Sequence, residues 1–134
     1  MIYLDSCALL KLVITEPESA ALREYMAEQS QSGVVGFASE LAHVEVRRAL
    51  IRREATQDRH VYADKVLGDY AKLPIAPAIP AASRLPHQHL ASLDALHLAT
   101  AASLGHALTQ FITYDKQLSK FAEEAGLPVF APGV

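Results

Sequence analysis

The chain has 134 residues, of which 51% are hydrophobic and 20% are charged, and it contains one cysteine. This length corresponds to one domain with its own apolar core, which argues against a two-domain enzyme, and the composition excludes a disordered chain. The net charge of −3 is too small to indicate a nucleic-acid tail, and the single Cys7 excludes an internal disulfide, so we expect one domain over residues 1–134 in the cytoplasm.

The first half of the chain predicts two short strands and three helices. The first strand ends at Asp5, and this charge, with no basic segment before it, is not typical of an export signal. Ser39 is expected to cap the longest of the three helices. The predicted strands cover 2–4 and 34–38, and the predicted helices cover 8–12, a segment from Pro17 through Met26, and a segment from Ser39 through Glu54.

The second half continues the alternation of helices and strands. Pro74 is expected to close a helix over 60–73, and two prolines make 75–81 a short edge strand or an extended connector. Polar residues within the uncharged stretch 95–114 argue against a membrane span. The remaining predicted elements are a helix from Ser92 to Gly105, a strand over 108–114, a helix over 116–125 and a strand over 127–130. The alternation predicts an α/β fold with parallel strand pairing.

Two aspartates follow predicted strands directly, and both are candidate site residues. Asp5 ends the first strand, and Asp115 follows the strand over 108–114. In an open parallel sheet the carboxyl ends of the strands form the edge where ligands bind. The alternative for either residue is a helix N-cap with no further role.

Two further acids lie on apolar faces of predicted helices. Glu45 interrupts the small and apolar face of its helix, whereas Glu40 points to the polar side. Asp94 lies in the first turn of its helix, on the same stripe as Leu98. A carboxylate on such a face needs a partner, because burying an unpaired charge is costly. The alternatives are an ion pair between Glu45 and Arg48 and a helix-dipole role for Asp94.

These four carboxylates are expected to meet at one edge of the sheet. Two such charges about 4 Å apart repel by roughly 4 kcal/mol at an effective dielectric constant near 20, so the cluster needs a positive partner. A divalent cation fits best, and oxygen ligands favour Mg²⁺ or Mn²⁺ over zinc. The predicted ligands are Asp5, Glu45, Asp94 and Asp115, with Ser6 and Thr113 as candidates for holding coordinated waters.

The local sequences around the four acids resemble the PIN-domain family, and their order and spacing are most similar to the VapC-type toxins of toxin–antitoxin pairs. The matching segments are Tyr3–Ser6, Val44–Ala49, Leu93–Ala99 and Ile112–Asp115. The resemblance covers nearly the whole chain. Cys7 departs from the family pattern, in which a small hydroxylated or apolar residue is usual, but it leaves the four acids intact.

The resemblance implies both a fold and an activity. The fold would be a PIN-like three-layer α/β/α arrangement with a central, mainly parallel sheet of four to five short strands. The activity would be that of an endoribonuclease dependent on one or two Mg²⁺ or Mn²⁺ ions, with the four acids as catalytic metal ligands and a metal-activated water that attacks RNA. As the toxin of a type II system, the protein would form a homodimer and bind a cognate VapB-like antitoxin.

Several arginines follow Glu45, and two of them are candidate RNA contacts. Arg48 and Arg52 lie on the Glu45 side of their helix, where they could contact phosphates. The alternative is a solvated face whose arginines form ion pairs with Glu54 and Asp58.

Two other functions remain open. An aspartyl-nucleophile phosphotransferase would use Asp5, but it requires a second aspartate at the position of Cys7. A non-catalytic protein-binding module would not need all four acids. Glycine-rich phosphate loops are absent from the sequence, and we expect His87 and His89 to be loop residues and His97 to pack or hydrogen-bond in the core.

Overall fold

The computed structural model describes residues 1–134 and contains a five-stranded parallel sheet with the strand order β3-β2-β1-β4-β5. Tyr3 of β1 lies beside Phe37 of β2 on one side and beside Phe111 of β4 on the other. The strands are β1 (Ile2–Leu4), β2 (Gly36–Ser39), β3 (Ala71–Leu73), β4 (Gln110–Ile112) and β5 (Val129–Phe130). The expected central parallel sheet is therefore confirmed.

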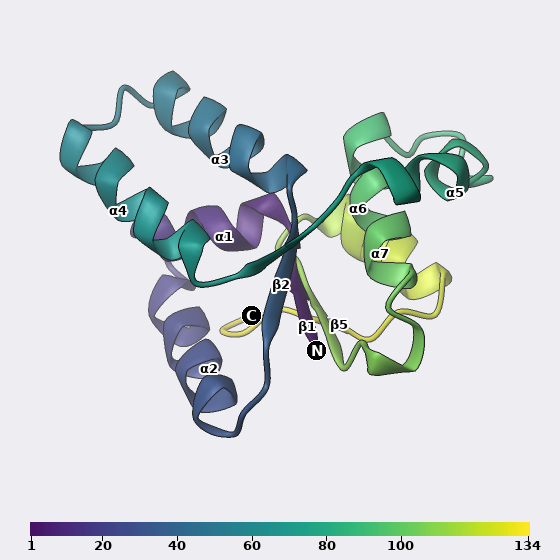
Figure 1. Ribbon diagram of the computed structural model, residues 1–134, viewed down its shortest axis with the longest axis horizontal. Helices are drawn as coiled ribbons and strands as arrows, with labels where there is room; N and C mark the ends of the chain where they lie inside the picture. Colours follow the sequence, from purple (N-terminus) through teal and green to yellow (C-terminus); the bar gives the residue numbers. More distant parts are fainter.

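Helices cover both faces of the sheet, which gives three layers (Figure 1). On one face lie α1 (Ser6–Val13), α2 (Ser19–Gln31), α3 (Leu41–Arg52) and α4 (Gln57–Gly68). On the other lie α5 (Ile79–Ser83), α6 (Ser92–Ala102) and α7 (Lys116–Glu124), with the 3-10 turns η1 (Ala76–Ala78) and η2 (Gly105–Ala107) in the connections. None of these helices combines the length and apolar character that crossing a membrane requires.

The apolar core has two parts because successive strand residues point to opposite faces. Ile2 and Leu4 belong to the cluster under α1, α3 and α4, whereas Tyr3 belongs to the cluster under α6 and α7. All three side chains are fully buried. The central strand β1 therefore fixes both helical layers relative to Asp5, the residue that follows it.

The segment after α4 differs from its predicted structure. The predicted helix over 60–73 ends at Gly68, and Ala71–Leu73 pairs with β2 as the edge strand. The segment predicted as an edge strand or connector, 75–81, instead forms η1 and the first turn of α5, each with a proline in its first turn. Proline suits a first helical turn because the backbone N–H that it lacks has no partner there.

Two predicted helix caps are also shifted. Ser39 does not occupy the N-cap position of α3, which belongs to Glu40, but its hydroxyl accepts a hydrogen bond from the Leu41 amide at 3.1 Å. Ser92 is the first residue of α6, and Ala91 precedes it as the N-cap. The two helices concerned, α3 and α6, lie where they were predicted.

Gly36 provides a test of the packing on β2. An added Cβ would lie 2.5 Å from the Tyr70 ring, so we expect Gly36→Ala to lower the free energy of unfolding by about 1–3 kcal/mol. Gly68→Ala is the matched control, because a Cβ there meets no atom within 4 Å and alanine is the better helix former. Urea unfolding measures both, and equal changes in the two variants would contradict this packing.

Candidate active site

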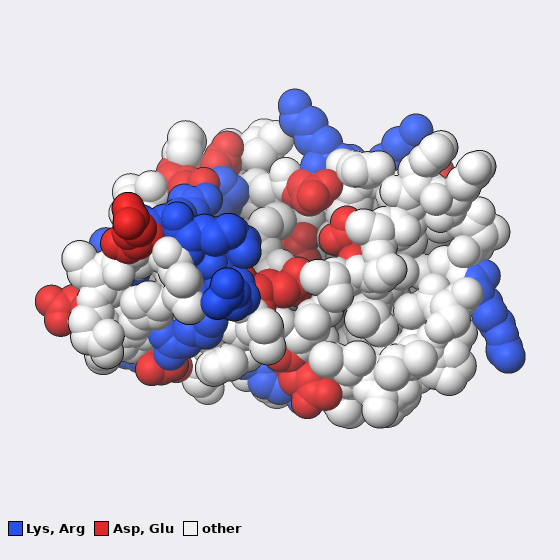
Figure 2. All heavy atoms as spheres, turned by 90° about the horizontal axis from the view of Figure 1, so that it is seen from above, with Lys and Arg blue, Asp and Glu red and all other residues white.

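The candidate site lies at the edge where the parallel strands end. Asp5 follows β1 and is the N-cap of α1, and Asp115 follows β4 and is the N-cap of α7. Glu45 lies within α3, which begins directly after β2, and Asp94 lies in the first turn of α6. Figure 2 looks down on this edge and shows acidic side chains recessed between the two halves of the molecule, with Lys and Arg gathered beside them.

Asp5 is the most buried of the four acids, at 2% exposed. Its Oδ1 accepts a hydrogen bond from the Ala8 amide at 2.9 Å, and the Cys7 thiol donates to the same carboxylate at 3.0 Å. Burial raises the pKa of Asp5, although the hydrogen bonds from Cys7, Thr113 and Ala8 oppose this change. The N-cap role and a place in the site therefore coexist at this residue.

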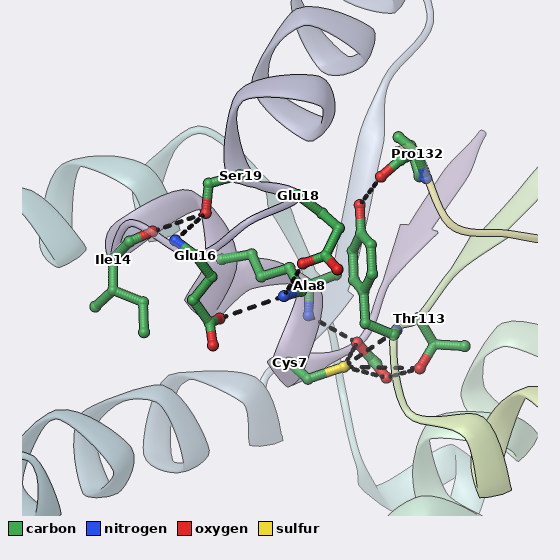
Figure 3. A network of polar contacts seen from close by, with 11 residues as sticks. Cys7, Ala8, Ile14, Glu16, Glu18, Ser19, Thr113 and Pro132 are labelled. Carbon is green, nitrogen blue, oxygen red and sulfur yellow. Dashed lines mark hydrogen bonds and ion pairs between the residues drawn. The ribbon is translucent and has the colours of Figure 1, made fainter. Parts of the chain in front are cut away.

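Thr113 joins the two aspartates that follow strands. Its buried hydroxyl donates to Asp5 Oδ2 and accepts a hydrogen bond from the Asp115 amide at 3.1 Å, and Figure 3 shows Thr113 close to Cys7. Since its single proton is given to Asp5, Thr113 positions a carboxylate directly, and the water-holding role expected for it stays a prediction. Ser6, the other candidate for that role, is the partly exposed first residue of α1.

Glu45 has a different partner from the one considered from the sequence. His97 Nε2 lies 2.6 Å from Glu45 Oε1, whereas no ion pair forms between Glu45 and Arg48. The Glu45 side chain is 21% exposed. Burial lowers the pKa of His97, but the hydrogen bond and charge of Glu45 outweigh it, so the net direction is upward. The histidine expected to pack or hydrogen-bond in the core thus contacts the site.

Asp94 shows that the acids are close enough to act on one another. Burial raises the pKa of this half-buried carboxyl, and the charges of Asp115, Asp5 and Glu45 raise it further, against an opposing effect of His97. No lysine or arginine forms an ion pair with any of the four acids. The fold therefore gathers four carboxylates with no lysine or arginine to balance them, and His97 is the one basic side chain that pairs with the group.

This donor set fits a divalent cation in type and in charge. The ligands are carboxylate oxygens, which suit Mg²⁺ or Mn²⁺, and no lysine or arginine compensates their negative charge. The acids are not arranged as a closed cage, since no three or more His, Cys, Asp or Glu residues are placed to hold one ion. The four acids therefore do not form a preformed metal centre in this structure.

The remaining candidates near the edge have other roles. The carboxylate of Glu40 accepts a hydrogen bond from the Ile75 amide at 2.8 Å and so ties α3 to the segment after β3. Cys7, which departs from the family pattern, donates to Asp5, and burial raises its pKa. His87 lies in the loop before α6, in agreement with a loop role, and its Nδ1 is 3.7 Å from Glu124 Oε2 on α7.

The arginines of α3 and α4 divide into two groups. Arg47 forms an ion pair with Asp64 and donates to the His60 carbonyl at 3.0 Å, which fixes α3 against α4. Arg59 donates to the Val13 carbonyl at 2.7 Å. In contrast, Arg48 and Arg52 are exposed and form no ion pair, so the expected alternative of pairs with Glu54 and Asp58 does not occur.

A sizeable cavity lies away from the four acids. It has a volume of about 650 Å³ and lies between α2, α4 and the start of β2. Its lining includes Met26, Val34, Tyr62, Val66 and Tyr70. Figure 2 shows acidic side chains at the sheet edge in an open groove between the two halves of the molecule, a form suited to a long polymer.

Comparison with known proteins agrees with this geometry. Residues 2–124 match the PIN domain family. This chain belongs to the PIN-domain family. It is 38% identical over 134 residues to Ribonuclease VapC47 of Mycobacterium tuberculosis (strain CDC 1551 / Oshkosh), with 99% of this chain and 98% of that protein covered. It is also 38% identical over 136 residues to Ribonuclease VapC46 of Mycobacterium tuberculosis (strain ATCC 25618 / H37Rv), with 98% and 97% covered. Within the PIN family it is therefore a VapC-type protein.

Two solved structures share the fold of this PIN protein. One is a chain of VapBC2 from Rickettsia felis, whose crystal structure contains a DNA fragment from the promoter of these proteins. It superposes on this chain with a TM-score of 0.77 at 12% identity, and the superposition covers 98% of this chain and 99% of that chain. A chain of FitAB bound to an IR36 DNA fragment superposes with a TM-score of 0.68 at 16% identity, covering 100% and 96%. At these identities the likeness concerns the fold alone.

Proposed function

We propose that this protein is a Mg²⁺- or Mn²⁺-dependent endoribonuclease and the toxin of a type II toxin–antitoxin system. The observation that carries the proposal is the gathering of four carboxylates from distant segments with no lysine or arginine paired to any of them, His97 being the one basic side chain that pairs with the group. The names of the two mycobacterial relatives, both ribonucleases at 38% identity over nearly their full length, support RNA as the substrate.

The chemistry follows from the positions of the side chains. Asp5, Glu45, Asp94 and Asp115 would hold one or two metal ions at the edge of the sheet. A bound Mg²⁺ or Mn²⁺ lowers the pKa of a coordinated water and neutralises charge on the phosphate oxygens. Thr113 keeps the Asp5 carboxylate in place, and the open groove admits the RNA backbone beside the acids. No side-chain nucleophile is needed for this hydrolysis.

Exposed arginines would hold the RNA next to the acids. Arg48 and Arg52 form no ion pair, which leaves their guanidinium groups available to phosphates. We expect the Arg48→Gln, Arg52→Gln double variant to bind single-stranded RNA more weakly, with a salt dependence reduced by about 0.7 in log–log slope for each lost contact. Fluorescence anisotropy in EDTA measures binding without cleavage. The exposed Lys120 on α7 supplies the control, Lys120→Gln, and equal losses in the two proteins would contradict a local RNA contact.

The proposal includes two protein partners. The complexes named VapBC2 and FitAB, which share the fold, support a cognate antitoxin that binds and inhibits the protein. A homodimer is the expected state of the toxin itself. Light scattering of the purified protein and co-purification with the product of an adjacent upstream gene test these partners separately from the activity.

Cleavage of RNA by the purified protein tests the function directly. We expect cleavage in Mg²⁺ or Mn²⁺, no cleavage in excess EDTA, and recovery when Mn²⁺ is added back. Undiminished cleavage in EDTA would contradict metal-dependent hydrolysis. Turnover of a small phosphomonoester with an adduct trapped at Asp5 would favour a phosphotransferase, and folded protein that cuts no RNA with either metal would favour a binding module.

A further inference from the structure

A buried chain of three polar side chains runs from the central strand to the candidate site. The Tyr3 hydroxyl lies 2.6 Å from His97 Nδ1, and His97 Nε2 lies 2.6 Å from Glu45 Oε1. Tyr3 is 0% exposed and His97 is 1% exposed, whereas Glu45 reaches the groove. Both ring nitrogens of His97 therefore have a partner, in a region where an unpartnered polar group would be costly.

The histidine ring is held rigidly. The Tyr3 ring stacks on Phe111 with a centroid distance of 5.4 Å and an interplanar angle of 3°, and it meets the His97 ring edge-on at 6.0 Å. Because Tyr3 and Phe111 are fully buried in adjacent strands, the imidazole cannot turn without breaking hydrogen bonds at both nitrogens. His97 thus provides a fixed anchor for one oxygen of the Glu45 carboxylate.

Each member of this chain is tied to a proposed ligand. Tyr3 precedes Asp5 by two residues along β1 and its extension, so the two side chains emerge on the same face of the strand. His97 follows Asp94 by three residues on α6, which places them on the same side of that helix. Glu45 is itself a proposed ligand. The chain therefore links β1, which leads directly into Asp5, to α6 and α3, which carry Asp94 and Glu45.

We propose that His97, supported by Tyr3, is a positioning residue that fixes the Glu45 carboxylate with Oε1 bound to the imidazole and Oε2 turned toward the groove. This inference rests on the proposed function, because it assigns the free oxygen to the metal. A long acidic side chain loses rotamer freedom when it binds an ion, and His97 removes that cost in advance. Loss of a hydrogen-bond partner behind a ligand typically weakens metal affinity 10–100-fold.

Equilibrium binding of Mn²⁺ in the absence of RNA tests this role. We expect His97→Leu to raise the dissociation constant for Mn²⁺ by about 10–100-fold. We expect His97→Gln, whose amide nitrogen can reach Glu45 from nearly the same place as Nε2, to restore most of the affinity. In the cleavage reaction, His97→Leu should lower kcat at a fixed Mn²⁺ concentration and leave the KM for RNA unchanged.

A matched variant separates positioning from packing. Thr100 is buried in the same helix, but its hydroxyl donates to the Leu96 carbonyl within α6 and does not contact the acids. We expect Thr100→Val to lower stability without changing Mn²⁺ affinity. If His97→Leu behaves like Thr100→Val in both measurements, His97 is only a core residue and the inference is wrong.

The outcomes also distinguish this inference from the proposed function. Wild-type protein that neither binds Mn²⁺ nor cuts RNA would overturn the proposed function. If the wild-type protein binds Mn²⁺ and cuts RNA, and the His97→Leu variant binds Mn²⁺ with unchanged affinity, this inference alone is overturned. If His97→Leu fails to fold, Tyr3→Phe decides instead, since loss of the hydroxyl should weaken Mn²⁺ binding several-fold, and unchanged affinity would contradict the role.

Discussion

Asp94→Asn should reduce RNA cleavage at least about a hundredfold while the protein keeps its fold. Asp94 lies in the first turn of α6, close enough to the other acids for their charges to raise its pKa, and it forms no ion pair with a basic side chain. A metal ion supplies several kcal/mol of transition-state stabilisation, and 1.36 kcal/mol corresponds to a factor of ten in rate. Single-turnover cleavage of a labelled RNA, alongside far-ultraviolet circular dichroism, measures both effects.

The control for this variant removes an acid elsewhere. Glu28 is exposed near the end of α2, and Glu28→Gln changes the net charge by the same amount as Asp94→Asn. Its cleavage rate should equal that of the wild type. If Asp94→Asn cuts RNA as fast as Glu28→Gln does, the carboxylate at position 94 plays no part in catalysis.

Substitutions at Asp5 should separate catalysis from folding. Asp5→Asn keeps an oxygen that can accept from the Ala8 amide, and asparagine is as good an N-cap as aspartate. Its amide nitrogen replaces Oδ2 and can only donate to the Thr113 hydroxyl, so we expect a folded but somewhat less stable protein with at least a hundredfold less cleavage. Asp5→Ala loses the cap, at about 0.5–2 kcal/mol, and leaves the buried Thr113 hydroxyl without its acceptor, at about 1–3 kcal/mol.

The two Asp5 variants should therefore be equally inactive but unequally stable. Thermal unfolding followed by circular dichroism gives the comparison, with the wild-type protein measured in the same EDTA buffer. A stable, active Asp5→Ala protein would contradict both roles of Asp5. An Asp5→Asn protein that is inactive only because it is unfolded would leave the N-cap role and remove the evidence for catalysis at this position.

Local sequence signals are sufficient for most of the fold. The strand before Asp5 was predictable because a short apolar run ends there at a capping residue. The helix before Gly126 was predictable because a glycine, here with a φ of 81°, commonly ends a helix. The edge strand Ala71–Leu73 was not predictable, because its residues favour a helix and only pairing with β2 makes it a strand. Lys72 reinforces it by donating to the Tyr70 carbonyl at 2.7 Å.

The candidate site shows the same division between local and tertiary information. The positions of Glu45 and Asp94 on apolar helix faces are local features, so helical periodicity was enough to single them out. The partner of Glu45 depends on how α3 and α6 meet across β1, and a sequence contains no local signal for that meeting. One clue was present, since His97 interrupts an otherwise apolar run of α6 and a buried imidazole requires hydrogen-bond partners.

Thermal unfolding with and without Mn²⁺ tests most directly whether the four carboxylates form a cation site. The raised pKa of Asp94 means that its ionised form destabilises the metal-free protein at neutral pH, so in EDTA we expect Asp94→Asn to unfold at a higher temperature than the wild type. At 100 times its dissociation constant, Mn²⁺ should stabilise the wild type by about 2.7 kcal/mol and Asp94→Asn by much less, which reverses the order. If Mn²⁺ stabilises the two proteins equally, or stabilises neither of them, the result contradicts a metal site built from these acids.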